Sequence, residues 1–274
     1  MKRVTCQVVF VSLFISLMMI NGYAADHQAT LKALRADISA NGYHYTVKYN
    51  PACDIPLDQL CTLRPEWAAA SDIMLEEFGQ TAVPVPGEGI SREMALPTSY
   101  TGYCGGIRNQ GPYGTCWAFA SVGVVESTFQ DGDNLSEQHL IDCNSAGYNQ
   151  NGGWFWFAEA INPGLCYEAD YPYVGPRGSC KEAPPYHDEI SNAYYVSGYP
   201  YPSVDNIKQK IYDKGAVAAA VYVNSAFQYY NSGCFSSCRD RTCNHAILLC
   251  GWNDSDCSGY GAWKLKNSWG PGWG

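Results

Sequence analysis

The stretch QGPYGTCWAF, residues 110–119, raises the question of whether Cys116 is a nucleophile or one half of a disulfide. A helix is predicted from Cys116 to Gln130, because the segment contains no proline and Gly132 follows it. Thr115 is an acceptable N-cap for this helix. Unpaired N–H groups at a helix N-terminus stabilise negative charge and so favour the thiolate, which is the attacking species. The sequence therefore places Cys116 where a reactive thiol is expected.

The other cysteines favour the competing interpretation. The chain has 274 residues and 13 cysteines, and its first residues are typical of a signal peptide over residues 1–24. Lys2 and Arg3 precede an apolar run over residues 8–20, which is shorter than the ~20 residues of a membrane span. We expect cleavage after Ala24, with an uncleaved anchor as the alternative. Secretion implies an oxidising compartment, in which most cysteines are paired in disulfides.

The segment that follows the signal peptide predicts a helix and then a strand. Residues 30–42 have an apolar face at helical spacing and end in Asn-Gly. Tyr and Val alternate with other residues over 43–49, which is typical of a strand. Cys53 and Cys61 flank a short turn and could form a local bridge.

A linker divides the chain into two parts. Residues 82–97 are rich in Pro and Gly and lack periodicity, so they are expected to form an exposed connection between a leader at 25–90 and a main domain at 91–274. In the main domain helices precede strands, which is typical of a two-lobed α+β domain. Further helices are predicted from Ser136 and over 203–214, and strands over 216–223, 246–250 and 262–266.

The five histidines include one strong candidate for a catalytic base. His245 begins an apolar strand, so its side chain is positioned rather than solvated. Asn267 follows another predicted strand and could orient an imidazole, although a loop Asn is ordinarily a turn residue. His139 is expected at the surface or partly buried on its helix. A lone histidine is more often structural than catalytic, so these residues gain weight only in combination.

A cluster near His245 could also be read as a zinc site. Its members are Cys234, Cys238, Cys243 and His245. The spacing fits no standard zinc finger, and an oxidising compartment disfavours thiolate ligands. We therefore expect no metal and no cofactor.

Several stretches of the main domain match one family in order. They are Gln110-Gly111, CWAF (116–119), LSEQHLIDC (135–143), NGG (151–153), YPY (171–173), NHA (244–246) and KNSWGPGWG (266–274). On these motifs the sequence resembles the papain-like cysteine peptidases, in which a His and an Asn follow the catalytic Cys by ~130–150 residues. His245 and Asn267 fit this spacing from Cys116.

The resemblance implies a papain-like two-lobed fold of the α+β class. Its helical left lobe would carry the nucleophile, and its β-barrel-like right lobe would carry the His and the Asn. By the family motif, Cys116 is the nucleophile, His245 the general base and acid, and Asn267 the residue that orients the imidazole. Trp269 would shield the His–Asn contact from water. Gln110 and the backbone N–H of Cys116 would form the oxyanion hole.

The same resemblance implies a substrate-binding cleft and one disulfide. Gly152 and Gly153 would let a substrate backbone approach closely, because they have no side chain. Five residues would line the S2 pocket, with ordinary core packing as the alternative: Trp154, Phe155, Ala220, Cys243 and Ala246. The implied disulfide joins Cys143 to Cys180.

The sequence departs from the family pattern at one disulfide and at its end. Tyr113 and Gln150 stand where the family has two bridged cysteines, so Tyr113 is expected to steady that loop by packing. Family members continue past the equivalent of Gly274 with further strands, so the chain is interpreted as C-terminally truncated, with the last strands of the second lobe absent.

The leader over residues 25–90 resembles a pro-segment. It is closer in length to those of cathepsin B-like enzymes than to the longer cathepsin L type. The sequence contains no occluding-loop insertion with paired His, which favours an endopeptidase over a dipeptidase.

The predicted function is that of a cysteine-type endopeptidase made as a zymogen in the secretory pathway, for an extracellular, lysosomal or vacuole-like compartment. Expected partners are protein or peptide substrates, the chain's own pro-segment and cystatin-like inhibitors, with the enzyme a monomer. A formal net charge of −9 argues against nucleic acid, and no membrane association is expected after signal cleavage. Two alternatives stay open: an inactive papain-like binding protein, and an acyltransferase or peptide ligase with the same triad. A disulfide-rich binding domain does not explain the ordered motifs.

Overall fold

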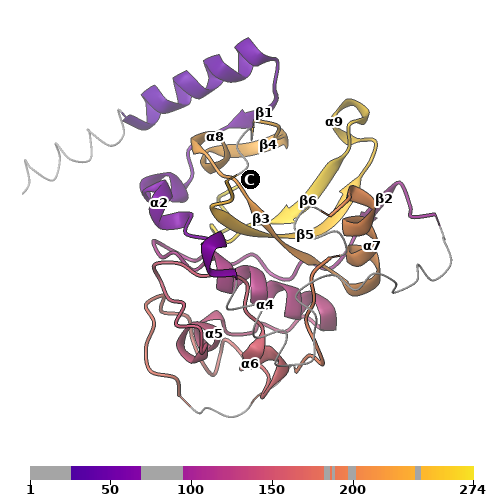
Figure 1. The fold of residues 1–274 in the computed structure, drawn as a ribbon. Helices are drawn as coiled ribbons and strands as arrows, with labels where there is room; N and C mark the ends of the chain where they lie inside the picture. Colours follow the sequence, from indigo (N-terminus) through magenta and orange to yellow (C-terminus); the bar gives the residue numbers. More distant parts are fainter. Residues whose placement is uncertain (1–25, 69–94, 182–185, 187–188, 197–201, 238–241) are drawn as a thin grey trace, which may run out of the picture.

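The computed structural model describes residues 26–68, 95–181, 186, 189–196, 202–237 and 242–274. It contains a lobe of helices and loops packed against a lobe built on an antiparallel sheet (Figure 1). The expected signal peptide, Cys238 and the linker except for residues 95–97 lie outside the described residues. Among the helices that the structure describes, none has the length and apolar character needed to cross a membrane.

Helix α4 (Cys116–Phe129) is the core of the first lobe, and nearly every residue along it is buried. The helix ends at Phe129, one residue earlier than the sequence predicts. Gln130, which follows, adopts a left-handed conformation (φ 59°). Thr115 occupies the N-cap position as expected, but its side chain makes no capping hydrogen bond. Its hydroxyl instead forms a hydrogen bond of 2.7 Å with the hydroxyl of Tyr173.

Two shorter helices complete this lobe: α5 (Glu137–Cys143) and α6 (Ala158–Ile161). Helix α5 begins as predicted, because the hydroxyl of Ser136 accepts a hydrogen bond from the N–H of His139 (2.9 Å). The expectation of a surface or partly exposed His139 is wrong, since this side chain is only 2% exposed. Its ring packs against those of Tyr171 and Tyr186, and burial lowers its pKa.

Strand β5 (His245–Asn253) is the centre of the second lobe and pairs antiparallel with three strands. These are β2 (Ser99–Thr101), β3 (Val217–Val221) and β6 (Ala262–Lys266). Eight of the nine residues of β5 are buried, which matches the continuous apolar run of its sequence. Helix α7 (Val204–Lys214) lies where a helix is predicted over 203–214, with Ser203 as its N-cap, and covers one side of this sheet through Ile211.

A buried ion cluster joins the two lobes. The carboxylate of Glu126 in α4 contacts the ammonium of Lys266 at the end of β6 (3.3 Å) and the guanidinium of Arg108 (3.5 Å). Burial lowers the pKa of Lys266, while the negative charge of Glu126 opposes this effect. Burial, reinforced by Glu126, raises the pKa of the nearby Glu137 to about 8.

The leader packs on the second lobe. Residues 26–41 are helical, and β1 (His44–Val47) pairs antiparallel with β4 (Tyr230–Cys234) of the main domain. The two strands lie together beside α8 (Ser225–Gln228) in Figure 1. Buried Tyr45 and Val47 pack in a cluster with Tyr229. Two of the alternating side chains predicted over residues 43–49 thus form the strand face that packs on the main domain.

The remaining leader elements lead toward the junction of the lobes. They are η1 (Pro51–Asp54), α2 (Leu57–Leu60) and η2 (Pro65–Trp67). Asn50 caps η1 and also donates a hydrogen bond to the carbonyl of Gln228 in the main domain (2.9 Å). The leader is therefore part of the same packed body as the main domain.

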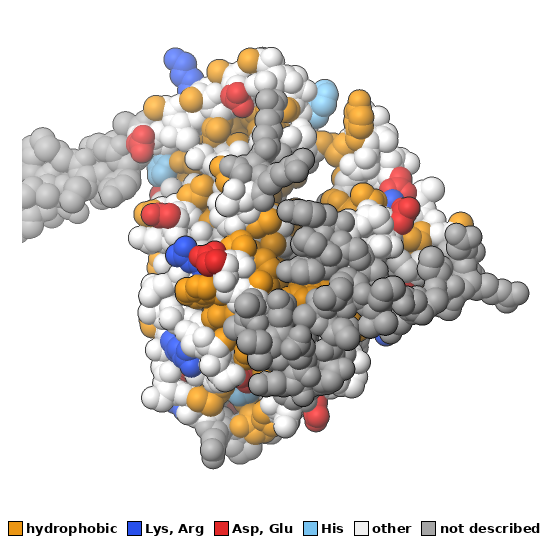
Figure 2. Space-filling view, in the orientation of Figure 1, with side chains coloured by type: hydrophobic (Ala, Val, Ile, Leu, Met, Phe, Trp, Pro, Cys, Tyr) orange, Lys and Arg blue, Asp and Glu red, His pale blue; other side chains and the backbone are white. Residues whose placement is uncertain are grey.

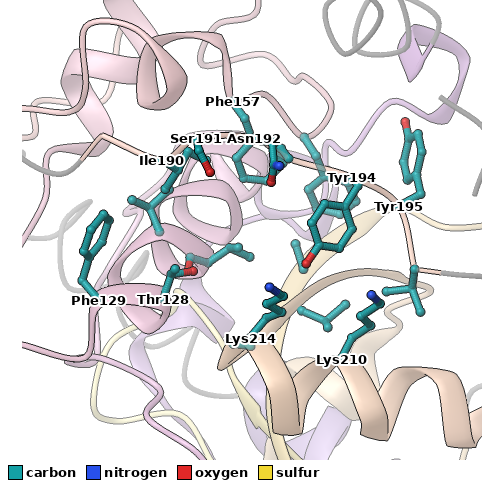
Figure 3. A pocket seen from close by; sticks show the side chains of 18 of the residues that line it. Thr128, Phe129, Phe157, Ile190, Ser191, Asn192, Tyr194, Tyr195, Lys210 and Lys214 are labelled. Atoms are coloured by element: carbon teal, nitrogen blue, oxygen red, sulfur yellow. The ribbon is translucent and has the colours of Figure 1, made fainter. Parts of the chain in front are cut away.

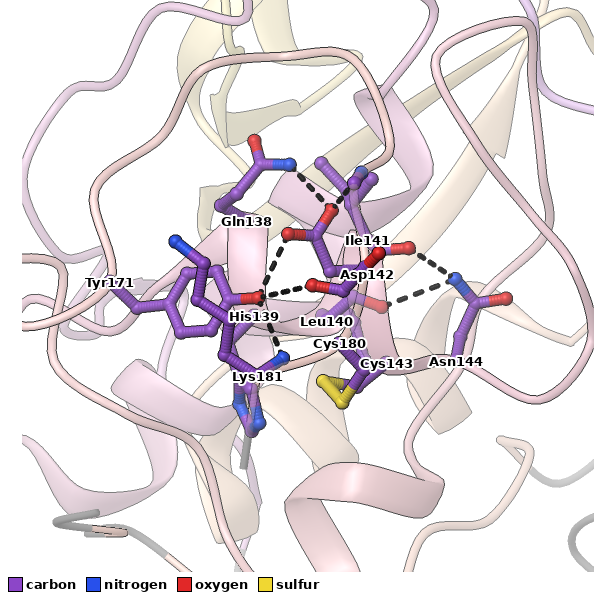
Figure 4. Close-up of a disulfide and its surroundings, with 12 residues drawn as sticks. Gln138, His139, Leu140, Ile141, Asp142, Cys143, Asn144, Tyr171, Cys180 and Lys181 are labelled. Carbon is purple, nitrogen blue, oxygen red and sulfur yellow. Dashed lines mark hydrogen bonds between the residues drawn. A yellow bond between two sulfur atoms is a disulfide. The ribbon is translucent and has the colours of Figure 1, made fainter. Parts of the chain in front are cut away.

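The structure has three disulfides among its described residues. Cys143 and Cys180 are bonded, as the resemblance implies, and the other pairs are Cys104–Cys250 and Cys234–Cys257. Figure 4 shows the first of these at the end of α5, beside the Asp142 carboxylate that accepts a hydrogen bond from the Tyr171 hydroxyl (2.9 Å).

The structure also bears on two other interpretations of the cysteines. The local bridge considered for Cys53 and Cys61 is wrong, because both thiols are free. The zinc interpretation is also contradicted, since Cys234 is in a disulfide with Cys257, in the short helix α9 (Asp256–Gly259). The described residues contain no group of three or more candidate ligands.

The loop that lacks the family disulfide is held by other contacts. The ring of Tyr113 lies so close to Gly175 that any Cβ there would collide with it, which matches the expectation that Tyr113 steadies the loop by packing. The N–H of Gly114 donates to the carbonyl of Gln150 (2.7 Å), and the Gln150 side chain accepts from the N–H of Arg177 (3.0 Å). Packing and hydrogen bonds thus take the place of the bridge.

We predict that Tyr113→Cys combined with Gln150→Cys, in a Cys116→Ala chain, forms a disulfide between these two segments. The hydrogen bond from Gly114 to Gln150 already holds the segments together. The bridge should raise the free energy of unfolding by about 2 kcal/mol, at the low end for a disulfide because the Tyr113 packing is lost. Urea unfolding with and without reductant measures the difference. A double variant that unfolds identically under both conditions would contradict this, and Gln150→Cys alone is the control.

Candidate active site

Cys116 is the first residue of α4 and is fully buried. It lies in the cluster where Ala246, the second residue of β5, also packs. Burial raises the pKa of the Cys116 thiol, while hydrogen bonds with the backbone of Ala246 and of Thr62 lower it. The helix start and the β5 strand thus bring Cys116 next to the residue that follows His245.

His245 and Asn267 are in direct contact. The Nε2 atom of His245 lies 2.8 Å from Oδ1 of Asn267, and the N–H of Ser268 donates to the same oxygen (2.9 Å). An oxygen acceptor requires the proton on Nε2, so Nδ1 carries the lone pair. Nδ1 is buried and has no hydrogen-bond partner among the residues that the structure describes. Burial lowers the pKa of His245 to about 4, although the hydrogen bond with Asn267 opposes this.

Trp269 covers the His245–Asn267 pair. Its ring centroid lies 4.8 Å from that of His245, and the two rings are tilted by 36°. Trp269 is 3% exposed and Asn267 is 6% exposed. The hydrogen bond between His245 and Asn267 is therefore enclosed in an apolar setting, where it is stronger than in water.

The Gln110 side chain is buried and held at both ends. Its Oε1 accepts a hydrogen bond from the hydroxyl of Ser268 (2.7 Å). Its Nε2 donates to the carbonyl of Tyr113 (2.7 Å) and to the carbonyl of Leu60 in the leader (3.1 Å). The amide that the sequence assigns to the oxyanion hole thus has a leader carbonyl as one of its acceptors.

The leader crosses the site in an extended conformation. The N–H of Leu63 donates to the carbonyl of Asn244 (3.0 Å), and the N–H of Arg64 donates to the carbonyl of Gly153 (2.9 Å). Leu63 and Gly153 form a parallel bridge. A Cβ at Gly152 would lie 2.5 Å from the carbonyl of Thr62, so the absence of a side chain there permits the close approach.

The five residues expected in S2 lie in one apolar cluster with Leu63. Trp154 and Ala246 are buried in it, and Phe155, Ala220 and Cys243 pack against it. The Cys243 thiol donates to the carbonyl of Ala220 (3.5 Å). Leu63 is 3% exposed, so this leader side chain occupies the region that the sequence assigns to a substrate side chain.

A separate cavity of about 460 Å³ opens between α4, α7 and the residues around Ile190 (Figure 3). Lys210 and Lys214 reach its edge from α7, and Thr128 and Phe129 line it from α4. Of the residues expected to bind substrate, only Phe155 lines this cavity. Cys116 and His245 do not, so the cavity is not the site of the expected chemistry.

Sequence reasoning missed the leader residues and one hydroxyl. Leu60, Thr62 and Leu63 follow no regular pattern that would mark them as the segment over Cys116. Ser268 lies inside the KNSWG motif, next to Asn267, so its position in the motif could have indicated its contact with Gln110.

The match to known proteins covers nearly all of the main domain. Residues 97–274 match the family model described as papain family cysteine protease. The chain belongs to this family. The expected papain-like fold is confirmed, since solved proenzymes with this fold superpose on the structure.

Curated papain-family relatives include ananain from Ananas comosus, 36% identical over 177 residues. That match covers 61% of this chain and 49% of ananain. Cathepsin L 1 from Paramecium tetraurelia is 37% identical over 178 residues, which cover 61% of this chain and 52% of the relative. The chain thus spans about half the length of the curated relatives that it matches.

Solved relatives include two precursors. Digestive procathepsin L 3 from the larval midgut of Tenebrio molitor has a TM-score of 0.74 and 25% identity, over 91% of this chain and 81% of that one. The recombinant stem bromelain precursor has a TM-score of 0.74 and 29% identity, over 90% of this chain and 80% of that one. Because these matches extend beyond residues 97–274, they include the leader of this papain-family chain.

We predict that Leu63→Ala loosens the leader over the site. The substitution removes a buried apolar side chain, which typically costs about 2–5 kcal/mol. In the presence of dithiothreitol, a thiol-directed peptide epoxide should therefore label Cys116 of the unprocessed variant faster than it labels the unprocessed wild type, as measured by mass spectrometry of the intact chain. Trp67→Ala is the matched control, since that leader side chain is 38% exposed. Equal labelling of Leu63→Ala and wild type would refute the packing argument.

We predict that acid destabilises the chain that carries His245 more than a chain in which His245 is replaced. The pKa of His245 is about 4 when the chain is folded and about 6.5 when it is unfolded, so the unfolded chain binds the proton first as pH falls. Stability is lost progressively from pH ~6.5 down to pH ~4, by about 3 kcal/mol at most. Urea unfolding of Cys116→Ala against Cys116→Ala/His245→Gln over this range isolates the effect.

The raised pKa of Glu137 gives the opposite trend, with stability present at low pH and lost as pH rises toward 8. Both chains in this comparison carry Glu137, so its contribution cancels in their difference. Parallel pH profiles for the two chains would mean that His245 is not protected from protonation.

Proposed function

We propose that the chain is the zymogen of a cysteine endopeptidase that hydrolyses peptide bonds through Cys116, His245 and Asn267. One observation carries this proposal. The enclosed His245–Asn267 pair, the Gln110 amide and a thiol at a helix N-terminus converge on the same place, and an extended segment of the chain crosses it.

The proposed reaction forms and breaks one thioester. Nδ1 of His245 takes the proton of Cys116, and the thiolate attacks the substrate carbonyl carbon. The imidazolium then gives that proton to the leaving amine, which leaves a thioester on Cys116. Water attacks the thioester with His245 as the base and releases the acid product. Asn267 holds the ring with Nε2–H toward its own oxygen throughout, so Nδ1 stays available.

The oxyanion of each tetrahedral intermediate would be stabilised by two fixed donors. One is the Gln110 amide, which the hydroxyl of Ser268 orients. The other is the backbone N–H of Cys116 at the start of α4. Donors that are in place beforehand need no reorganisation during the reaction, which is why such sites lower the barrier.

The leader would inhibit the enzyme by occupying the cleft. The carbonyl of Leu60 accepts a hydrogen bond from the Gln110 amide, and the side chain of Leu63 packs in the apolar cluster. The burial that it causes raises the pKa of Cys116 and lowers that of His245, and both changes disfavour the ion pair of a thiolate and an imidazolium. Removal of the leader readmits water and would restore that pair.

Secretion to an extracellular or lysosome-like compartment fits the three disulfides. On the face shown in Figure 2 the basic side chains are scattered rather than gathered into a patch, in keeping with a protein or peptide substrate and not a nucleic acid. We further propose that the processed enzyme is a monomer and that cystatin-like proteins inhibit it.

The two alternatives predict different products. An inactive binding protein would form no thioester, whereas a ligase would transfer the acyl group to an added amine. Product analysis with and without an amine nucleophile distinguishes hydrolysis from ligation. The Gln110 amide, the free Cys116 and the ordered His245 together favour an active enzyme over the binding protein.

We predict that Cys116→Ala abolishes hydrolysis of a fluorogenic peptide by the processed enzyme, because Cys116 is the thiol that the proposed reaction acylates. Cys243→Ala is the matched control. This free thiol donates to the Ala220 carbonyl in the expected S2 lining, so its loss should change KM but not abolish hydrolysis. A thiol-directed epoxide should modify Cys116 alone. Equal hydrolysis by wild type and Cys116→Ala would overturn the proposed mechanism.

We predict that Gln110→Ala lowers kcat by about 10²–10³-fold, as expected for the loss of one oxyanion donor. The KM for the same peptide should change little, since the amide acts mainly on the transition state. Ser268→Ala should give a smaller loss of kcat, because it only releases one end of the Gln110 side chain. A Gln110 variant that lost affinity but kept kcat would show that this amide binds substrate instead.

A further inference from the structure

The leader places a second thiol at the nucleophile. Cys61 is a free, half-buried cysteine between Leu60, whose carbonyl accepts from Gln110, and Thr62, whose side chain packs tightly on Gly114. Both neighbours of Cys61 are thus fixed against the walls of the site. Neither the sequence motifs nor the proposed reaction gives this thiol a role.

The leader segment around Cys61 lies over the nucleophile. Leu63 packs in the same apolar cluster as Cys116. The side chain of Cys61 packs against a second cluster, which contains Leu60 and Trp269, whose ring covers His245. The negative charge of Cys116 also raises the pKa of Cys61, an effect that follows the larger one of burial.

The other free thiols that we compare are held elsewhere. Cys53, also in the leader, packs in the cluster of Tyr45 and Tyr229 and donates to the carbonyl of Gln228 (3.7 Å). Cys243 lies in the main domain and donates to Ala220. Cys61 is thus the leader thiol that lies in the segment over the site, whereas Cys53 provides an internal control.

We propose that Cys61 and Cys116 form a reversible disulfide that holds the leader covalently on the nucleophile. The inference rests on the proposed role of Cys116 and adds a form of regulation to it. Cleavage of the linker alone then leaves the enzyme inactive, because the leader stays attached through sulfur. Activation requires a reductant as well as a protease.

The oxidant is a low-molecular-weight disulfide, R–S–S–R, such as oxidised glutathione. The Cys116 thiolate attacks one sulfur of this donor, the donor S–S bond breaks, and one thiolate leaves. The Cys61 thiolate then attacks the sulfur of Cys116 in the mixed disulfide and displaces the second thiolate. The protons of the two cysteines end on the two released R–SH molecules.

The order of events follows from burial. Cys116 is fully covered when the leader is docked, so the donor reacts before the leader closes over the site. Docking then brings Cys61 to the mixed disulfide. A disulfide needs Cα atoms about 4.4–6.8 Å apart, so the proposal requires the docked leader to bring Cys61 within that spacing of Cys116.

The direct test is a disulfide map of the full-length chain. The zymogen is refolded with oxidised and reduced glutathione, quenched in acid, alkylated with N-ethylmaleimide and digested without reduction. Mass spectrometry should find a peptide that links Cys61 to Cys116 and that dithiothreitol removes. Cys53→Ser should keep this link and Cys61→Ser should lack it. Recovery of Cys116 as an alkylated thiol or a glutathione adduct, or of Cys61 bonded to Cys53, would overturn the proposal.

A labelling assay separates this proposal from that of the enzyme activity. After cleavage of the linker, reductant should raise the rate at which a peptide epoxide labels wild-type Cys116 by about tenfold or more, and should leave the rate for Cys61→Ser unchanged. Equal responses of the two chains would refute the disulfide even if both hydrolyse peptide. A mapped Cys61–Cys116 link in a chain that never hydrolyses peptide after reduction would instead refute the proposed activity and leave the disulfide standing.

Discussion

The packing of α4 against β5 is the constraint on which the site depends. The helix begins at Cys116 and the strand begins at His245, so the contact between their first residues sets how the two side chains meet. Gly123 lies against Leu248 farther along the same interface, where an added Cβ would be in ordinary van der Waals contact with the Leu248 side chain. Each lobe supplies only part of the chemistry, and the interface between them completes it.

The direction of the leader is the second determining feature. Leu63 and Gly153 pair in parallel, and the carbonyl of Leu60 is bound by the Gln110 amide. The leader thus uses the hydrogen-bonding groups of the cleft. Buried apolar residues extend along the leader from Tyr45 on β1 to Leu63. Occupancy of the cleft is therefore coupled to the pairing of β1 with β4, far from Cys116. Inhibition is in this sense a property of the whole docked segment.

The fold class and the family could be predicted because they rest on ordered local motifs, and the structure and the comparisons confirm both. The catalytic assignments to Cys116, His245 and Asn267 stay predictions, although the structure places these residues around one site. Tertiary contacts were harder to foresee. His139 lies on a polar stretch of helix, but aromatic rings that come from distant loops bury it. The position of Leu63 depends on strand pairing between segments far apart in the sequence, which no local pattern encodes.

The buried pair of Glu126 and Lys266 has a consequence for how the lobes respond to their surroundings. Glu126 belongs to the helix that begins with Cys116, and Lys266 directly precedes Asn267. At about 0.1 M salt, dissolved ions largely screen exposed charges that lie more than about 10 Å apart, but they screen a buried pair much less. The alignment of the two halves is therefore insensitive to salinity. The same catalytic spacing would persist from a dilute fluid to a concentrated one.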